Sequence, residues 1–104
     1  SFLYIDDALE GIRKLMDSDF LGPVNIGSEE LISINNLAKM IMEIAGKNLR
    51  IKHIPGPTGV RGRNADLTLA RQKINWEPKT PLRVGIEKTY RWIESRVRKN
   101  KNEN

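Results

Sequence analysis

The chain has 104 residues, a formal net charge of +5, 38% hydrophobic residues and 30% charged residues. This length supports one domain with a single modest core, and no apolar run approaches the roughly 20 residues that a membrane span requires. Because there are no cysteines and only one histidine, disulfides, cysteine-based zinc sites and a histidine metal cluster are excluded, and a reducing, cytoplasmic setting is expected.

The first residues, SFLYIDD, begin as an apolar, strand-like run with no initiator methionine and no signal-peptide pattern. We therefore expect the chain to be a piece of a longer protein. Residues 2–5 are predicted to be a short strand, and Asp6 and Asp7 to supply N-cap and first-turn carboxylates to a helix that runs to about Asp17. One apolar face of this helix is expected to lie on the core, formed by Leu9, Ile12, Leu15 and Met16.

The middle of the chain predicts one well-bounded helix. Ser33 is placed to cap it, and Gly46 stands at the position where a helix that ends near Ala45 would need left-handed backbone. Its buried stripe is expected to contain Leu37, Met40, Ile41 and Ile44. Two further strands are predicted at residues 24–26 and 49–54, and residues 31–34 are another short apolar stretch.

The last third predicts two helices. A short one runs from an Asp66 cap through Ile74, and Asn75, which tolerates left-handed backbone, ends it. Pro81 introduces the final helix, whose apolar residues recur at spacings of three and four. Trp76 and Trp92 are expected to be buried against that final helix. The predicted fold is a small α/β domain of three or four helices with short strands, too short for a complete Rossmann sheet.

The basic charge is concentrated at the end of the chain. Residues 96–104 hold four basic residues and one acidic residue, a net +3, which leaves +2 for residues 1–95. We therefore divide the chain into a domain, 1–95, and a basic helix end with a disordered tail, 96–104. A stand-alone nucleic-acid-binding module that uses this tail is the alternative of a different class.

The segment HIPGPTGVRGRNAD, from His53 to Asp66, contains glycines with the spacing G-x-x-G-x-x-G. A dinucleotide cradle is disfavoured, because such a cradle needs a helix directly after the glycines and a second apolar strand beyond it. A nucleic-acid clamp of the GxxG type is disfavoured because Pro57 and Thr58 occupy its centre. The remaining interpretations are that Arg61 and Arg63 bind phosphate through bidentate guanidinium contacts, or that they are solvated side chains of a surface loop.

Three motifs carry a family resemblance along essentially the whole chain. They are F-x-Y-I-D-D-A-x-E-G at Phe2–Gly11, P-V-N-I-G-S at Pro23–Ser28, and N-W-E-P-K-x-P-L-x-x-G-I at Asn75–Ile86. Together they resemble the C-terminal, substrate-binding domain of extended short-chain dehydrogenase/reductases, the NAD-dependent epimerase/dehydratase family. Within this family, the loop 53–66 is most like that of members that act on GDP-mannose.

The resemblance implies a two-domain parent enzyme, expected to be a homodimer, that epimerises, dehydrates or decarboxylates nucleotide sugars. It implies an N-terminal Rossmann domain that binds NAD and supplies a catalytic Tyr-x-x-x-Lys pair. Neither Tyr4 nor Tyr90 begins that motif, because Ala8 and Glu94 stand four positions later. The chain alone is therefore expected to bind no NAD and to have no catalytic residue.

Site residues follow from the same resemblance. Arg63 matches the family arginine that grips the nucleotide diphosphate, and Arg61 and Asn64 lie beside it in the motif. The implied chemistry is a transient oxidation of the sugar by NAD, which makes the neighbouring carbons acidic enough to epimerise. His53 is expected to be structural, and the Asp6/Asp7 pair to act at the helix start and not as a catalytic dyad.

Overall fold

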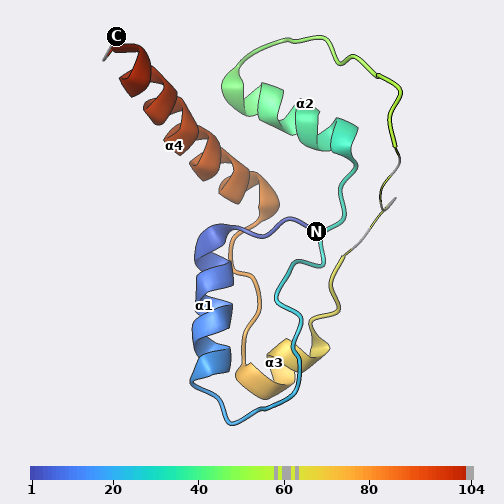
Figure 1. Cartoon of the computed structure of the whole chain (residues 1–104), viewed down its shortest axis with the longest axis vertical. Coiled ribbons are helices and arrows are strands. Elements are labelled where there is room, and N and C mark those ends of the chain that lie inside the picture. Colours follow the sequence, from blue (N-terminus) through green and yellow to red (C-terminus); the bar gives the residue numbers. More distant parts are fainter. Residues whose placement is uncertain (58, 60–61, 63, 103–104) are drawn as a thin grey trace.

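The computed structural model describes residues 1–57, 59, 62 and 64–102. Its elements are α1 (Ile5–Met16), α2 (Ile34–Ala45), α3 (Thr68–Ile74) and α4 (Leu82–Asn102). Helices α1 and α3 pack together at one end of the molecule and α2 and α4 contact each other at the other end, joined by long irregular segments (Figure 1). The prediction of three or four helices is confirmed.

The expected strands are not found, since none of the residues that the structure describes has strand conformation. Ile5 begins α1 and Ile34 begins α2, while the rest of the segments 2–5, 24–26, 31–34 and 49–54 is irregular. A strand requires a neighbour that completes its ladder of hydrogen bonds, and an apolar pattern does not by itself supply that neighbour. The α/β class is therefore not shown for this chain.

The predicted helix ends are largely confirmed. The Ser33 hydroxyl accepts a hydrogen bond from the backbone N–H of Asn36 at 3.1 Å, and α2 ends at Gly46 with φ of 67°. Asn75 ends α3 with φ of 51°. At the start of α3 the N-cap is Leu67 and not the predicted Asp66. The Asp66 carboxylate nevertheless accepts from the Thr68 N–H at 3.0 Å. Short polar side chains and left-handed backbone thus satisfy the groups that these helix ends leave unpaired.

The core lies where α1 meets α3 and the turn after it. Trp76 is 1% exposed, and its indole Nε1–H donates to the backbone oxygen of Asp7 at 3.0 Å. Gly11 permits this approach, because a Cβ added there would lie 3.0 Å from Trp76 Cε2 and 3.0 Å from Ile26 Cδ1. The buried cluster consists of Leu67, Ala70, Ile74 and Trp76.

Asp6 and Asp7 lie in the first turn of α1 as predicted, but Tyr4 is the residue at the N-cap. Asp7 is 5% exposed, and its Oδ2 accepts from the backbone N–H groups of Lys79 at 3.2 Å and Thr80 at 2.9 Å. The carboxylate therefore fastens the turn after Trp76 to α1. The Asp7 carboxylate is occupied by the turn, and the adjacent Asp6 is exposed. This arrangement supports a structural role for the pair and not a catalytic dyad.

Two predictions of burial are wrong. Trp92 is 60% exposed on α4, where it lines an open cavity with Tyr4 and Ile5, and the Arg96 guanidinium lies 5.1 Å from its ring centre. On α1 the covered face is that of Asp7, Gly11 and the half-buried Leu15, so of the expected core stripe only Leu15 packs against the core. The other three members, Leu9, Ile12 and Met16, are at least half exposed, as is Ile5 beside them.

The C-terminal helix α4 continues through Asn102, so residues 96–102 are helical, as the prediction of a basic helix end requires. Along it Arg91 and Arg98 pair with Glu94, at 3.5 and 3.7 Å. In the described part of the chain, no helix is both long and apolar enough to cross a membrane.

Candidate functional site

Two of the three predicted site residues, Arg61 and Arg63, lie outside the described residues. Their described neighbours show how the loop is attached. Gly62 lies near Leu31, because a Cβ added to the glycine would be 3.9 Å from Leu31 Cδ1. The Asn64 side-chain Nδ2–H donates to the backbone oxygen of Glu29 at 3.2 Å. The C-terminal side of the loop is thus fixed on the segment 28–31.

The next contacts extend this attachment. The Ala65 N–H donates to the Ser28 oxygen at 3.0 Å, and a Cβ added to Gly27 would lie 2.9 Å from Ala65 Cβ, so the two backbones approach closely. Ser28 is buried, and the Ser1 hydroxyl both donates to its oxygen at 3.0 Å and accepts from its N–H at 2.9 Å.

An ion-pair cluster lies beside this attachment. Arg71 on α3 contacts Glu29 Oε1 through Nη1 at 2.7 Å and Glu77 Oε2 through Nε at 3.0 Å. The hydrogen bond from Arg71 is the main reason that the pKa of Glu29 is lowered, and Glu29 in turn raises the pKa of Arg71. Sequence reasoning missed this cluster, because Glu29 and Arg71 are 42 positions apart and no local pattern joins them.

Asp66 fixes the far end of the loop to α3. Its carboxylate accepts from the Thr68 hydroxyl at 2.7 Å as well as from the Thr68 N–H, and these bonds lower the pKa of Asp66. On the other side of the loop His53 is exposed in an irregular segment, not in the strand that the sequence predicted.

In the described residues, the glycines of the loop are followed by irregular backbone, and the first helix after them begins only at Thr68. A dinucleotide cradle needs a helix directly after its glycines, so this arrangement disfavours one here. Among the described residues no group of three or more acidic or histidine side chains could hold a metal ion.

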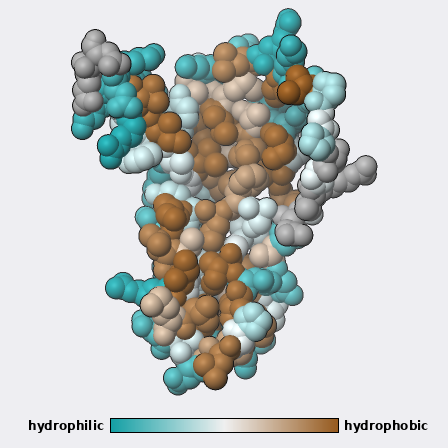
Figure 2. Space-filling view, viewed as in Figure 1, coloured by the Kyte–Doolittle hydropathy of each residue, from teal (hydrophilic) through white to brown (hydrophobic). Residues whose placement is uncertain are grey.

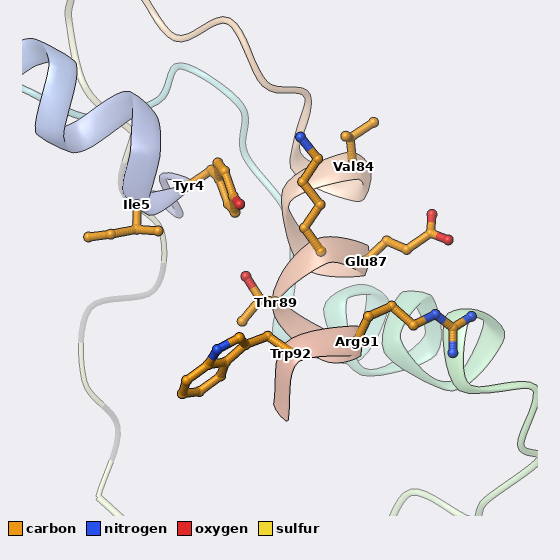
Figure 3. Close-up of a pocket in the computed structure, with 8 residues that line it drawn as sticks. Tyr4, Ile5, Val84, Glu87, Thr89, Arg91 and Trp92 are labelled. Atoms are coloured by element: carbon orange, nitrogen blue, oxygen red, sulfur yellow. The ribbon is translucent and has the colours of Figure 1, made fainter. Parts of the chain in front are cut away.

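A cavity lies elsewhere in the molecule. It has a volume of about 810 Å³ and lies between the start of α1 and one side of α4, where Tyr4, Ile5, Val84 and Trp92 line it (Figure 3). Lys88 also lines this cavity, and its ammonium group is 5.5 Å from the centre of the Tyr4 ring. No described residue of the loop 53–66 contributes to this cavity.

Comparison with known proteins identifies the class first. No protein-family model matches the chain. The chain is nevertheless similar to enzymes named for their nucleotide-sugar substrates. UDP-glucuronic acid decarboxylase 5 of Arabidopsis thaliana is 36% identical over 83% of the chain, and dTDP-4-dehydro-6-deoxy-D-allose reductase of Streptomyces bikiniensis is 35% identical over 94% of it. These matches confirm the resemblance to the NAD-dependent epimerase/dehydratase family.

Within this class, the chain is also similar to a particular enzyme over nearly its whole length. GDP-mannose 3,5-epimerase of Arabidopsis thaliana is 48% identical over 101 residues, which is 97% of the chain, and GDP-mannose 3,5-epimerase 1 of Oryza sativa gives the same values. The match covers 27% of each of these epimerases, so the chain spans about a quarter of their length.

Proposed function

We propose that the chain is the substrate-binding part of an NAD-dependent nucleotide-sugar epimerase whose substrate is GDP-mannose. The observation that carries this proposal is the 48% identity to GDP-mannose 3,5-epimerase over nearly the whole chain, including the arginine loop. Catalysis then belongs to a longer protein of which this chain is one part.

In this proposal Arg63 grips the diphosphate of the substrate and Arg61 assists it. A guanidinium group matches phosphate oxygens with two parallel hydrogen bonds, which a lysine does not provide. Asn64 belongs to the same site, and its bond to the Glu29 oxygen supports a role in holding the loop. The chain thus contributes binding energy and orientation, which position the sugar for reaction.

NAD and the catalytic Tyr-x-x-x-Lys pair are assigned to an N-terminal Rossmann domain of the longer protein, because neither tyrosine here begins that motif and the first described helix after the glycines starts only at Thr68. NAD supplies reversible hydride transfer when it is bound. The chain alone should bind GDP-mannose weakly or undetectably, because half of the site is absent. A homodimeric, cytoplasmic parent remains part of the proposal.

The outer face of α1 is the surface that we assign to this N-terminal domain. Its stripe of Ile5, Leu9, Ile12 and Met16 recurs at helical spacing and is exposed, and hydrophobic side chains gather over α1 in Figure 2. The radius of gyration is 17.1 Å, against about 13 Å for a compact chain of this length. An incomplete core with an uncovered apolar helix face is what a domain cut from its neighbour would present.

The test of substrate binding is Arg63→Ala in the longer enzyme, with GDP-mannose as substrate. Loss of a charge-assisted phosphate contact predicts a rise in KM of about 10- to 100-fold. The matched control is Arg83→Ala, which removes an exposed arginine of α4 that pairs with Glu43 at 2.9 Å, and it should leave KM unchanged. Equal KM values for the Arg63 variant and the wild type would contradict the proposal.

A second candidate is a UDP-glucuronic acid decarboxylase, which the 36% identity to that enzyme favours. Both candidates use a nucleotide-sugar diphosphate, so Arg63→Ala does not separate them. Assaying the longer enzyme with GDP-mannose and with UDP-glucuronic acid does: release of carbon dioxide from the second substrate identifies the decarboxylase.

A further inference from the structure

Two segments of the chain run antiparallel beside the proposed site. Asn25 Nδ2 donates to the Asp66 oxygen at 3.3 Å, the Ser28 oxygen accepts from Ala65 N, and the Glu29 oxygen accepts from Asn64 Nδ2. As the first segment advances from 25 to 29, the second retreats from 66 to 64. The segment 25–31 therefore forms an edge that binds residues 64–66, the C-terminal side of the arginine loop.

Glu29 is bound both through its backbone and through its side chain. Its backbone oxygen accepts from Asn64, while its carboxylate Oε1 contacts Arg71 on α3 at 2.7 Å. Arg71 is itself fixed by Glu77 at 3.0 Å, so it cannot leave Glu29 without breaking a second ion pair. The position of the Glu29 backbone, and with it the attachment of Asn64, is thus set by α3.

The neighbouring residue ties the same edge to a third element. Glu30 Oε2 accepts from the N–H of Leu82, the first residue of α4, at 3.0 Å. Ser28, Glu29 and Glu30, which we call the 28–30 hub, therefore connect the loop to the chain start, α3 and α4.

The Glu29–Arg71 pair is exposed, with side chains 47% and 43% accessible, so it adds little to the stability of the whole domain. Arg71 contacts each of the two glutamates through one nitrogen, and what this network of three charges supplies is restricted geometry. A loop that must present arginine to a diphosphate gains from an attachment that does not move.

We infer that Glu29 and Arg71 are positioning residues for the nucleotide-diphosphate site. They contact no phosphate themselves; they hold Asn64 and Ala65, the described residues that directly follow Arg63 in the chain. This inference rests on the proposed function, because it names what the loop is held in place to bind.

The test uses Glu29→Gln in the longer enzyme, which keeps the backbone oxygen and side-chain size but removes the charge. Losing an exposed ion pair predicts a rise in KM for GDP-mannose of about two- to fivefold with little change in kcat. The matched control is Arg83→Gln, which breaks the similarly exposed Arg83–Glu43 pair far from the loop and should not change KM.

A second readout does not depend on activity. In the chain itself the Ala65 N–H, which donates to Ser28, should exchange with solvent several-fold faster in Glu29→Gln than in the wild type or in Arg83→Gln. Unchanged exchange, or equal acceleration in both variants, overturns the positioning role.

A double-mutant cycle separates this inference from the proposed function. If Arg63→Ala alone leaves KM unchanged, the proposed function fails, and the inference fails with it. If Arg63→Ala raises KM and Glu29→Gln has no further effect in that background, the inference is supported, because Glu29 then acts through Arg63. If the two effects add, Glu29 acts independently of Arg63 and the inference is wrong.

Discussion

The buried carboxylate of Asp7 makes the sharpest prediction about stability. It accepts two backbone N–H groups, from Lys79 and Thr80, in the turn that follows Trp76. Asp7→Ala would leave both donors without this acceptor. An unsatisfied, partly buried donor costs about 1–3 kcal/mol, and the bond to Lys79 is long, so we expect a loss of about 2–4 kcal/mol in the free energy of unfolding.

Asp6 provides the control. Both aspartates lie in the first turn of α1, so Asp6→Ala removes the same interaction with the helix dipole, about 0.3–1 kcal/mol, without touching the turn. Urea unfolding followed by circular dichroism at 222 nm measures both. If Asp7→Ala is too unstable to fold, Asp7→Asn replaces it: both N–H groups donate to the single oxygen Oδ2, so an amide oxygen can still accept both without the charge, and its loss should fall between the two alanine variants. Equal losses for the two alanine variants would refute the assignment of Asp7 to the turn.

Three further predictions concern packing, pH and the tail. Gly11→Ala should lower the free energy of unfolding by about 1–2 kcal/mol, since overpacking outweighs the gain in helix propensity, whereas Gly59→Ala, in open space, should be neutral in the same urea assay. Because the Arg71 hydrogen bond lowers the pKa of Glu29 below 4.5, the contact is complete above pH 4.5 and is lost as pH falls through the lower folded value, which faster amide exchange in the loop would report. Deleting residues 96–104 should leave the KM for GDP-mannose unchanged, and RNA binding that disappears with them would favour the nucleic-acid alternative.

The features that the sequence predicts well are those decided within a few residues. As expected, Ser33 begins α2, Gly46 ends it and Asn75 ends α3, because a cap depends on one side chain or one backbone conformation. Asp66, predicted as the cap of α3, lies one position before the actual N-cap, Leu67, although its carboxylate accepts from the N–H of Thr68.

The predictions that failed concern burial, which depends on residues distant in the chain. The apolar periodicity of α1 correctly marks a helix, but two of its faces are suitable for burial, and Gly11 and Trp76 decide which one is covered. Trp92 is a large apolar residue, but it faces an open cavity and is 60% exposed. The candidate site shows the same division: Arg61 and Arg63 are proposed from a sequence motif, whereas Glu29 and Arg71 are brought together only by the fold.

The 28–30 hub also has a consequence for the order of assembly during folding. Its hydrogen bonds join residues 27, 35, 42 and 52 positions apart, whereas the helices it connects are stabilised by bonds of four residues or fewer. Closing such long loops costs chain entropy before any contact returns it, so distant pairings form late. We therefore expect the helices to form first and the arginine loop to be seated last, so that a newly made chain acquires its secondary structure before it can recognise a ligand.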